Sequence, residues 1–391
     1  MDSLQNYLIE ICSAYLEKRQ VSLSDDVDYD GLYRLANAHN LSGIVFCVIN
    51  TAPNSNIVPK EAFKRFENDF LEAVVRYDFQ SRQIAEIDAL CSGAGIRHIF
   101  FKGAAIRDLF PVPEARAMGD ADMLICLPDR NRVKNLLTDN GFVCENSNGN
   151  VYDYRKDSLL CEVHTKIISG KIGECDLETA FEDATAHAVF DGACGKLDDN
   201  YHFAYLIAHI AHHFWFYGAG VKLILDLAVM LKAKSIDIEK VFEYLKPCKL
   251  ETFAKIILTV TYNWFGCGQA FDVGTDSAEV FLLSYGAFGN AGRNKSAVIT
   301  RKELEDGHSG SGFGTKLRLL FPSYARVKNI PYIRFIDGRP YLLPAAWVYR
   351  IYYNLRYRRK FAADATKNIG SDDTKKEAQR ELAFFEEIGL L

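Results

Sequence analysis

The stretch that decides the fold is FKGAAIRDLFPVPEARAMGDADMLI, residues 101–125. It places Lys102-Gly103 directly after an apolar run, and it then sets Asp120 and Asp122 around a single alanine. Residues i and i+2 of a strand point to the same face, so the two carboxylates lie together. They repel one another unless a cation lies between them. The stretch predicts a strand, a glycine-led turn with a short helix, and a second strand that carries a cation site.

A second acidic strand is predicted in SLLCEVHTKI, residues 158–167. Glu162 and His164 share one face of this apolar segment. If the strand pairs with the one that begins at Asp120, Glu162 becomes a third carboxylate of the cluster. Three carboxylates can hold two Mg²⁺ (or Mn²⁺) ions about 3.5–4 Å apart. Asp120, Asp122 and Glu162 are therefore the predicted catalytic residues and metal ligands.

Lys102 and Gly103 suit the phosphates of a bound nucleotide. A glycine that opens a helix lets backbone N–H groups approach a phosphate closely, and the lysine adds a point charge. Arg116 lies four residues before Asp120, and its guanidinium is the candidate for binding the β- and γ-phosphates. A surface arginine that pairs with Glu114 or Asp108 is the alternative.

The order of these motifs resembles the DNA-polymerase-β-like nucleotidyltransferase superfamily. Residues 30 to 360 look like the bacterial family of uncharacterised nucleotidyltransferases, whose pattern has a Lys-Gly step, an Arg before D-x-D-x-L, an E-x-H strand and a His-rich helix followed by Leu-Asp-Leu. Here the last part reads AHIAHHFWFYGAGVKLILDLAVML, residues 208–231. The resemblance implies Mg²⁺-dependent transfer of a nucleoside monophosphate from an NTP, with release of pyrophosphate. It also implies that Gly103 binds the phosphates and that the three acidic residues bind the metal.

Two residues depart from the pattern of these relatives. Ala104 stands where the superfamily has a small residue, often Ser, whose hydroxyl can bind phosphate. Lys222 stands where the family often has Arg before the helix that contains Leu-Asp-Leu. We expect Lys102 to compensate for the first difference.

The His-rich helix supplies further candidates for the cleft around the acceptor. His209 and His213 have i, i+4 spacing, and we predict hydrogen-bonded histidines that line this cleft, as His164 does; a zinc site is the alternative. Asp226 lies in the apolar run LILDLAVML, where a buried carboxylate needs a partner. One of the histidines or Lys222 is the predicted partner, and contact with the acceptor is a second interpretation of Asp226.

The composition is that of an ordinary globular protein. The chain has 391 residues, 49% of them hydrophobic, and a net charge of −5, which suggests no general affinity for nucleic acid. The ten cysteines occur singly, without a C-x-x-C pair, and are expected to be buried reduced thiols in a cytoplasmic protein. We expect no signal peptide, and no apolar run of about eighteen residues predicts a spanning helix.

Changes in hydrophobic period divide the chain into three predicted parts. Residues 1–95 form an N-terminal helical region, with helices over 4–16, 29–49 and 60–92. Residues 96–200 form the nucleotidyltransferase core with a mixed sheet, and residues 201–391 form a C-terminal helical region that begins with two helices joined at FYGAG. The predicted fold class is α+β, with a polymerase-β-like core flanked by helical regions. Strands of the core are predicted over 96–101, 120–127, 142–146, 151–155 and 158–167.

The segment 316–360 is strongly basic, with eleven Lys or Arg residues and one acidic residue. Trp347, Ile351 and Leu355 form a predicted apolar stripe, and Arg350 occupies another face. Such a segment attracts an anionic membrane surface or RNA, although nucleic acid is not the favoured partner. The favoured interpretation is a solvated helix whose basic side pairs with acidic residues of the same protein.

These patterns leave three hypotheses for the function. The first is a cytoplasmic nucleotidyltransferase that uses an NTP and a two-metal mechanism on a hydroxyl acceptor, which is a small molecule, a protein or an RNA. The second is a non-catalytic protein of the same fold that binds a nucleotide or a partner. The third is a metal hydrolase built on the histidine cluster.

Overall fold

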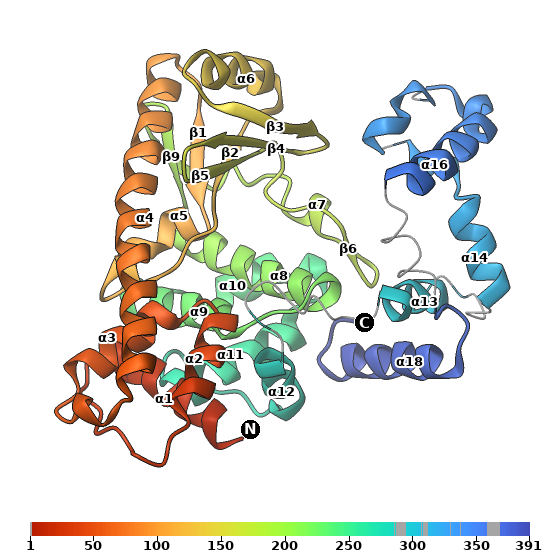
Figure 1. Ribbon diagram of the computed structural model, residues 1–391. Helices are drawn as coiled ribbons and strands as arrows, with labels where there is room; N and C mark the ends of the chain where they lie inside the picture. The colour runs from red at the N-terminus through yellow and green to blue at the C-terminus, as the bar shows by residue number, and fades with distance from the viewer. Residues whose placement is uncertain are drawn as a thin grey trace. The chain divides into compact units, whose positions relative to one another are not determined.

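The computed structural model describes residues 2–284, 286, 295–305, 307, 312–328, 330–336, 338–357 and 368–391. The chain forms two compact units, one of Met1–Asn290 with Ile388–Leu390 and one of Ala291–Glu387 with Leu391. The first unit holds a seven-stranded mixed sheet, with helices before and after it in the chain (Figure 1). The predicted α+β class is confirmed.

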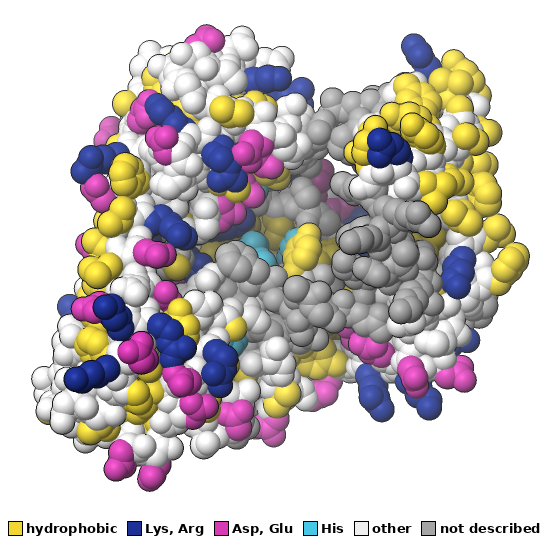
Figure 2. Space-filling model, viewed as in Figure 1, with side chains coloured by type: hydrophobic (Ala, Val, Ile, Leu, Met, Phe, Trp, Pro, Cys, Tyr) yellow, Lys and Arg dark blue, Asp and Glu magenta, His cyan; other side chains and the backbone are white. Residues whose placement is uncertain are grey.

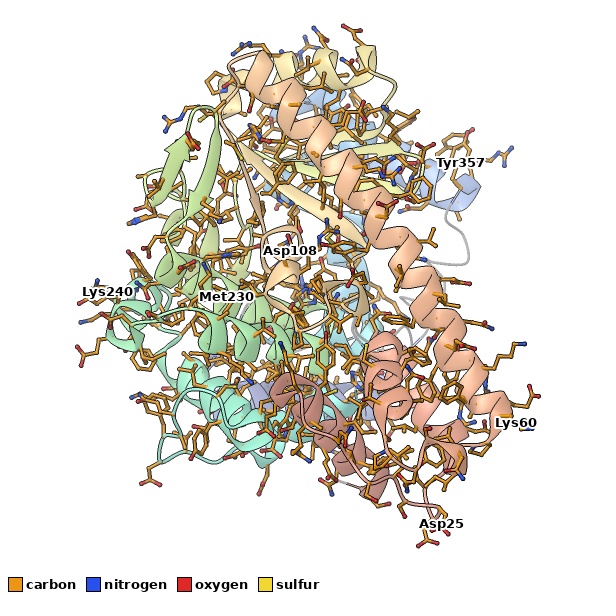
Figure 3. The ribbon with its side chains drawn as sticks, turned by 90° about the vertical axis from the view of Figure 1, so that its left-hand side faces the viewer. Asp25, Lys60, Asp108, Met230, Lys240 and Tyr357 are labelled. Atoms are coloured by element: carbon orange, nitrogen blue, oxygen red, sulfur yellow. The ribbon has the colours of Figure 1, made fainter. Side chains whose placement is uncertain are left out.

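Four helices precede the sheet: α1 (Ser3–Glu17), α2 (Tyr29–Ala38), α3 (Ser42–Thr51) and α4 (Lys60–Gly93). The single helix predicted over 29–49 is wrong, because Asn40 adopts a left-handed conformation with φ 56° between α2 and α3. The long helix predicted over 60–92 is confirmed. In Figure 3 this helix starts at Lys60 and passes first the other N-terminal helices and then the sheet.

The sheet has the strand order β3-β4-β5-β2-β1-β9-β8. β2 pairs with β5 and β1 pairs with β9 in parallel, while the other neighbours are antiparallel. The first five strands along the chain agree with the predicted ones, whereas β8 and β9 were not predicted. The strands are β1 (His98–Phe101), β2 (Asp120–Ile125), β3 (Val143–Asn148), β4 (Val151–Lys156), β5 (Leu159–His164), β8 (Ala188–Asp191) and β9 (Cys194–Leu197).

Short elements connect the strands. They are α5 (Gly103–Ile106), the 3₁₀ turns η2 (Arg107–Leu109), η3 (Pro113–Ala115) and η4 (Leu127–Asp129), α6 (Arg130–Asp139), the small pair β6 (Lys171–Ile172) and β7 (Cys175–Asp176), and α7 (Leu177–Ala180). The short helix predicted after Lys102 is thus a single α-turn followed by a 3₁₀ turn.

The two faces of the sheet differ in chemistry because side chains alternate along each strand. One face packs into an apolar core whose residues include Met123, Cys161 and Val163 of the sheet and Ile87 of α4. The opposite face carries the acidic residues of β2 and β5. On that face the ring of Phe101 lies 5.5 Å from the ring of Tyr205 on the following long helix, so the acidic face looks toward the later helices.

The described residues after the sheet in the first unit form five α-helices and one 3₁₀ helix: α8 (Asp199–Phe216), α9 (Val221–Ala233), α10 (Ile238–Leu245), η5 (Lys246–Cys248), α11 (Glu251–Phe265) and α12 (Asp276–Ser284). The Asp198 carboxylate accepts hydrogen bonds from the amides of Asn200 and Tyr201 and thereby caps α8. Gly218, with φ 105°, makes the turn to α9. The predicted helix pair joined at FYGAG is confirmed, and both helices lie below the sheet in Figure 1.

The ten cysteines all lie in the part of the chain that the structure describes, and all are free thiols. Nine of them are buried or half-buried, as expected. Cys126 is exposed, contrary to the expectation, because it follows the last residue of β2 at the end of the strand. Leu127 is exposed too, so burial in the run DMLICL ends at Ile125, two residues earlier than its apolar character suggested.

The second unit is helical in its described residues. Residues 329, 337 and 358–360 of the basic segment lie outside the described residues. Arg318 and Arg326 both approach Glu303, so part of the basic charge is paired within the protein. The elements of this unit are α13 (Lys295–Glu305), α14 (Gly312–Leu320), α15 (Tyr324–Val327), η6 (Pro331–Ile336), η7 (Pro340–Leu342), α16 (Leu343–Tyr357) and α18 (Asp372–Glu387).

The apolar stripe predicted on α16 is only partly covered. Trp347 Nε1 and Arg350 Nη1 donate to backbone carbonyls of the preceding segment, so these two side chains turn inward together. Leu355 is instead 64% exposed, and Val348 and Tyr352 are exposed on the same helix. Figure 2 shows hydrophobic side chains gathered over this unit. None of the helices in the described ranges is both long enough and apolar enough to cross a membrane.

Candidate active site

The turn after β1 brings the backbone of Lys102 into an unusual conformation. Lys102 has φ 50° and ψ −131°, a combination that glycine adopts far more easily than lysine. Its backbone N–H donates to Nε2 of His202 over 3.2 Å. The strained residue of the Lys-Gly pair is therefore the lysine.

Gly103 is required for a different reason. A Cβ atom at this position would lie 2.7 Å from Nη1 of Arg116, well inside van der Waals contact. The guanidinium thus lies directly against the backbone of the predicted phosphate-binding turn. A side chain on residue 103 would separate the two.

The two acidic strands lie side by side in the sheet. In the parallel ladder of β2 and β5, Asp122 is the register partner of Glu162, and Phe101 faces Asp122 from β1. The expected adjacency of these strands is confirmed. Asp122 is only 2% exposed, whereas Glu162 is half-buried.

Two further side chains converge on the Asp122 carboxylate. Lys102 Nζ donates to its Oδ1 over 2.7 Å, and Nε2 of His164 lies 2.9 Å from the same oxygen. His164 Nε2 also lies 3.5 Å from Oε2 of Glu162. One ligand atom from each of Asp122, Glu162 and His164 lies within 4.8 Å of the other two. These atoms are close enough to share a cation.

The charges of this cluster shift its proton affinities. Burial alone would raise the pKa of Asp122, but Lys102 and His164 outweigh it, and the pKa is lowered. Burial opposes the charged form of His164, yet its hydrogen bonds to Asp122 and Glu162 raise its pKa. Asp122 is therefore ionised, and a cationic side chain of the protein already compensates its charge.

Asp120 is in a different electrostatic state. Burial, followed by repulsion from Asp122 and Glu162, raises its pKa to about 6. Lys102 and Lys222 act in the opposite direction without outweighing these effects. The first aspartate of the pair therefore holds its proton to a higher pH than the second does.

Asp153 is an acidic neighbour that the sequence patterns did not single out. It lies on β4 as the register partner of Glu162, and burial and that neighbour raise its pKa. A signal for it exists in the run VYDYR, because Tyr152 and Tyr154 face the apolar core and the residue between them must face the other way. Asp153 thus extends the acidic row across a third strand.

Arg116 connects the turn to α9. Its Nε and Nη2 donate to the two carboxylate oxygens of Asp226, each over 2.9 Å, and both residues are buried. The prediction that a histidine or Lys222 is the partner of Asp226 is therefore wrong. The alternative of a surface arginine is wrong as well, because the fold buries this guanidinium. Asp226 holds it in place against the turn.

Lys222 of α9 adds a second lysine to the cluster. Burial and the Arg116 guanidinium lower its pKa to about 8, whereas Asp226, Asp120 and Asp122 act in the opposite direction. Its ammonium group is therefore within electrostatic reach of the acidic pair. Lys222 therefore supplies a second cationic side chain near the acidic pair.

The histidines of α8 are largely buried side chains that pack as rings. His209 lies 5.9 Å from the ring of Tyr205 and 4.5 Å from that of His213, whose Nδ1 lies 3.3 Å from the Gly218 carbonyl oxygen. Burial lowers the pKa of His213 to about 4 and that of His209 well below its usual value. Among the described residues, neither candidate metal-binding group contains a histidine of α8. The metal-hydrolase hypothesis therefore has no ligand cluster in that part of the protein.

The donor set on β2 and β5 fits a divalent cation. The carboxylates of Asp122 and Glu162 are oxygen ligands of the kind that Mg²⁺ and Mn²⁺ prefer, and the imidazole nitrogen of His164 lies beside them. Asp120 is not one of these three closely spaced groups, but its charge interacts with both carboxylates. Lys102 Nζ would have to leave Asp122 Oδ1 before that oxygen could bind a metal.

One family of known proteins matches the part of the chain that builds this site. The family model described as "Uncharacterised nucleotidyltransferase" matches residues 25–266, more than half of the chain. The chain belongs to this nucleotidyltransferase family. The match includes the whole of the acidic cluster, the Lys102-Gly103 turn and the helices α8 and α9.

Other comparisons found little further similarity. A search of the curated proteins found no match. Among solved structures, the crystal structure of the Megavirus polyadenylate synthase is similar to this chain with 12% sequence identity and a TM-score of 0.27. That similarity covers 55% of this chain and 40% of the viral protein, which is less than two thirds of the latter's length.

Proposed function

We propose that this member of the family transfers a nucleoside monophosphate from an NTP to a hydroxyl acceptor by a two-metal mechanism with Mg²⁺ (or Mn²⁺). The observation that supports it best is the pairing of Asp122 with Glu162 beside the Lys102-Gly103 turn. Asp120, Asp122 and Glu162 would hold the ions, which when bound supply positive charge for the attacking and leaving oxygens. His164 steadies both Asp122 and Glu162.

The phosphates of the NTP have cationic partners in this proposal. Lys102 exchanges its contact with Asp122 for the triphosphate, and the backbone N–H of Gly103 donates to a phosphate oxygen. Arg116 supplies positive charge from directly behind Gly103, and its buried Nη1 has no hydrogen-bond partner among the described residues. Asp226 acts as a positioning residue, because both of its oxygens bind the guanidinium.

The transfer step moves one proton and one nucleotidyl group, the nucleoside monophosphate. The acceptor hydroxyl oxygen forms a bond to the α-phosphorus, and the bond from that phosphorus to the bridging oxygen of pyrophosphate breaks. Glu162 takes the hydroxyl proton, since it is the more exposed carboxylate of its pair with Asp122. His209 and His213 line the acceptor side of the cleft as neutral side chains.

The proposal also covers the location of the protein, the parts of the chain and the basic segment. Ten free cysteines support a reducing, cytoplasmic location. The division into residues 1–95, 96–200 and 201–391 is our proposal for the functional parts of the chain. The first role we assign to the basic segment 316–360 is pairing with acidic residues of the same protein. Its exposed aromatic residues support a second role, a peripheral membrane contact.

The test is nucleotide-dependent stabilisation of the full-length protein. With Mg²⁺ present, at least one of the four NTPs should raise the melting temperature, and Asp122→Asn should abolish the metal-dependent part of the shift. Asp139→Asn, which changes an exposed carboxylate at the end of α6, is the matched control and should behave as wild type. No shift with any NTP would contradict the proposal. Binding without release of pyrophosphate would favour the non-catalytic alternative.

A further inference from the structure

A second group of metal-ligating side chains lies at the opposite end of β1 from the Lys102-Gly103 turn. Asp88 of α4, His98 of β1 and Cys194 of β9 each offer one ligand atom, and these three atoms lie within 4.8 Å of one another. None of the three residues belongs to the acidic cluster. A thiol and an imidazole beside one carboxylate give this group a different chemistry from that of the candidate active site.

The backbone of the sheet fixes two of these residues. In the parallel pairing of β1 with β9, His98 is the register partner of Cys194, and its backbone N–H donates to the Ala193 carbonyl over 3.0 Å. Register partners on neighbouring strands point to the same face of a sheet. Phe100 follows two residues later and packs against the apolar core that includes α4, so His98 and Cys194 face that helix too.

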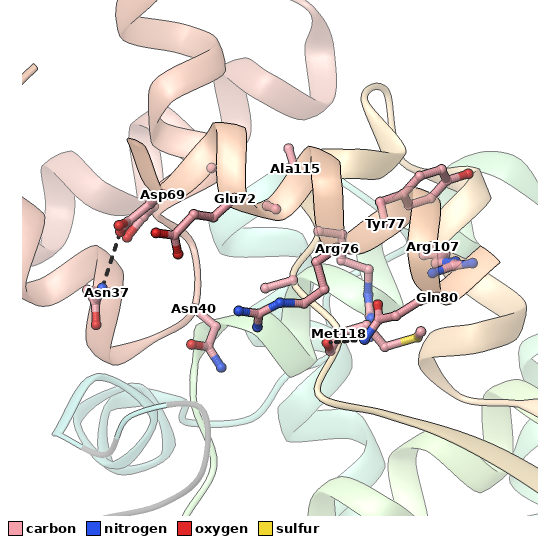
Figure 4. Close-up of a pocket in the computed structure, with 15 residues that line it drawn as sticks. Asn37, Asn40, Asp69, Glu72, Arg76, Tyr77, Gln80, Arg107, Ala115 and Met118 are labelled. Carbon is pink, nitrogen blue, oxygen red and sulfur yellow. Dashed lines mark hydrogen bonds between the residues drawn. The ribbon is translucent and has the colours of Figure 1, made fainter. Parts of the chain in front are cut away.

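Hydrogen bonding and packing hold α4 against the sheet and thereby fix the position of Asp88. Gln80 of this helix donates to the Met118 carbonyl over 3.1 Å, at the wall of a pocket (Figure 4). Asp88 lies about two turns further along the helix, between Ile87 and Cys91, which are both fully buried. Regular, packed elements therefore position all three ligand atoms.

The ring of His98 has the orientation of a metal ligand. Its Nδ1 lies 2.9 Å from the Ile96 carbonyl oxygen, which can only accept, so Nδ1 carries a hydrogen. Nε2 then points at Asp88, whose Oδ1 lies 2.7 Å away. An unprotonated nitrogen and a carboxylate oxygen both accept, so a proton or a metal ion has to lie between them. Metal-bound histidines typically donate their second N–H to such a carbonyl.

The same contacts disfavour a catalytic role for the thiol. A nucleophilic cysteine needs a base that takes its proton, but Ile96 and Asp88 already engage both ring nitrogens of His98. Burial, followed by the hydrogen bond to Asp88 and the charge of that residue, raises the pKa of the Cys194 thiol to about 11. The thiol is therefore a poor nucleophile, whereas a bound metal ion displaces a thiol proton.

An ion can reach the three ligand atoms from solvent. The Asp88 side chain is 42% exposed and Cys194 is half-buried, whereas the His98 side chain is fully buried. One sulfur, one nitrogen and one oxygen ligand suit Zn²⁺, which takes four ligands in a tetrahedron and accepts the thiolate that Mg²⁺ does not favour. The carboxylate and the thiolate together neutralise the two charges of this ion.

We propose that Asp88 Oδ1, His98 Nε2 and Cys194 Sγ bind one Zn²⁺ ion, with a water molecule as the fourth ligand. On binding, the proton between Nε2 and Oδ1 and the proton of the thiol pass to solvent. The ion joins α4, β1 and β9, and it therefore fastens the edge strands β9 and β8 to the rest of the protein. This site goes beyond the proposed function, because transfer from an NTP uses neither the thiol nor zinc.

The test is titration of the full-length, chelator-treated protein with Co²⁺, which reports a thiolate ligand by a charge-transfer absorption in the near ultraviolet. The wild type should show this absorption, Zn²⁺ should displace it, and Cys194→Ala should lack it. Asp88→Asn should weaken Zn²⁺ binding at least tenfold in competition with a chelating dye, since loss of even an outer-shell partner costs about 10–100-fold. Asp88→Asn changes an exposed side chain and stays informative if Cys194→Ala does not fold.

Two control variants separate this site from other ligands of the chain. Cys126→Ala removes an exposed thiol and should keep the absorption. Asp122→Asn disables the acidic cluster and should keep it too, although it abolishes the Mg²⁺-dependent stabilisation by NTP. A wild type without the absorption would overturn the proposal, as would a band that survives Cys194→Ala or disappears in Cys126→Ala, or an unchanged Zn²⁺ affinity of Asp88→Asn. None of these results bears on the NTP-dependent stabilisation.

Discussion

Asp122 and Glu162 are register partners on two parallel strands, although they lie far apart in the sequence. The ladder fixes their spacing, since neighbouring strands keep a constant separation. Lys102 Nζ and His164 Nε2 then meet at one oxygen of Asp122. The acidic cluster is therefore set by the backbone of the sheet rather than by flexible loops, and side-chain substitutions can test it without moving the carboxylates apart.

The backbone conformation of Lys102 gives a first prediction. Lys102→Ala and Lys102→Gly both remove the ammonium group, but only glycine adopts φ 50° and ψ −131° without strain. We expect the free energy of unfolding of Lys102→Gly to exceed that of Lys102→Ala by about 1 kcal/mol. Urea denaturation of the two variants measures the difference, and equal stability would refute the strain at this position.

The contact of Gly103 with Arg116 gives a second prediction. An alanine at 103 would press its methyl group against Nη1, so Gly103→Ala should lower the free energy of unfolding by about 1–3 kcal/mol. Gly93 is the matched control, because a Cβ there meets nothing within 4 Å at the end of α4. Gly93→Ala should leave the stability unchanged or raise it slightly. Thermal unfolding distinguishes the two variants.

The buried pair of Arg116 and Asp226 gives a third prediction. Asp226→Asn leaves the guanidinium buried without its charge partner and should cost about 3–5 kcal/mol of unfolding free energy. The double variant Arg116→Met with Asp226→Leu buries no charge and should be more stable than Asp226→Asn. A double variant as unstable as the single one, measured by urea denaturation, would show that the loss comes from packing and not from the orphaned charge.

The raised pKa of Asp120 predicts a pH dependence. Because the folded-state pKa, about 6, exceeds the ordinary value of 3.8, the folded protein holds this proton more tightly than the unfolded chain does. Stability therefore falls as the pH rises from about 4 to about 6, and the destabilisation is fully present above that range. Without metal at pH 7.5, Asp120→Asn should be more stable than wild type, by about 3 kcal/mol of unfolding free energy.

The measurement that checks this linkage is the melting temperature of both proteins between pH 4 and pH 8. The advantage of Asp120→Asn should shrink as the pH falls from about 6 to about 4, because the wild-type carboxyl then becomes protonated in the folded state. A constant difference across the range would contradict a raised pKa and would assign the effect of the substitution to packing.

Most of the sheet and of the acidic cluster could be predicted from the sequence, because both depend on local patterns. The two-residue spacing of Asp120 and Asp122 and the E-x-H of β5 determine which side chains share a face. The strand β9 could not be predicted, since its CGKL run has little strand character, and one helix was placed across Asn40. The error at β9 arises because pairing with a distant strand overrides a weak local preference, whereas the break at Asn40 has a local cause, since asparagine readily adopts the left-handed conformation.

Pairings between distant residues were beyond the reach of the sequence. Nothing local distinguishes Arg116 from a surface arginine, and only the fold brings it to Asp226. The same holds for Arg107. Its place beside Asp108 in the sequence suggests an exposed side chain, but the fold buries it against α4. Periodicity identifies faces of single elements, whereas partners across elements require the three-dimensional structure.

The bond from Arg116 to Asp226 also limits how the protein can be shortened. The guanidinium lies against the Lys102-Gly103 turn, but the carboxylate that neutralises it belongs to α9, well after the last strand of the sheet. A fragment that ends with β9 would keep every acidic residue of the cluster and still leave an uncompensated charge at its centre. A fragment that keeps this ion pair must therefore extend through α9, so the sheet and the two helices after it have to be expressed and engineered together.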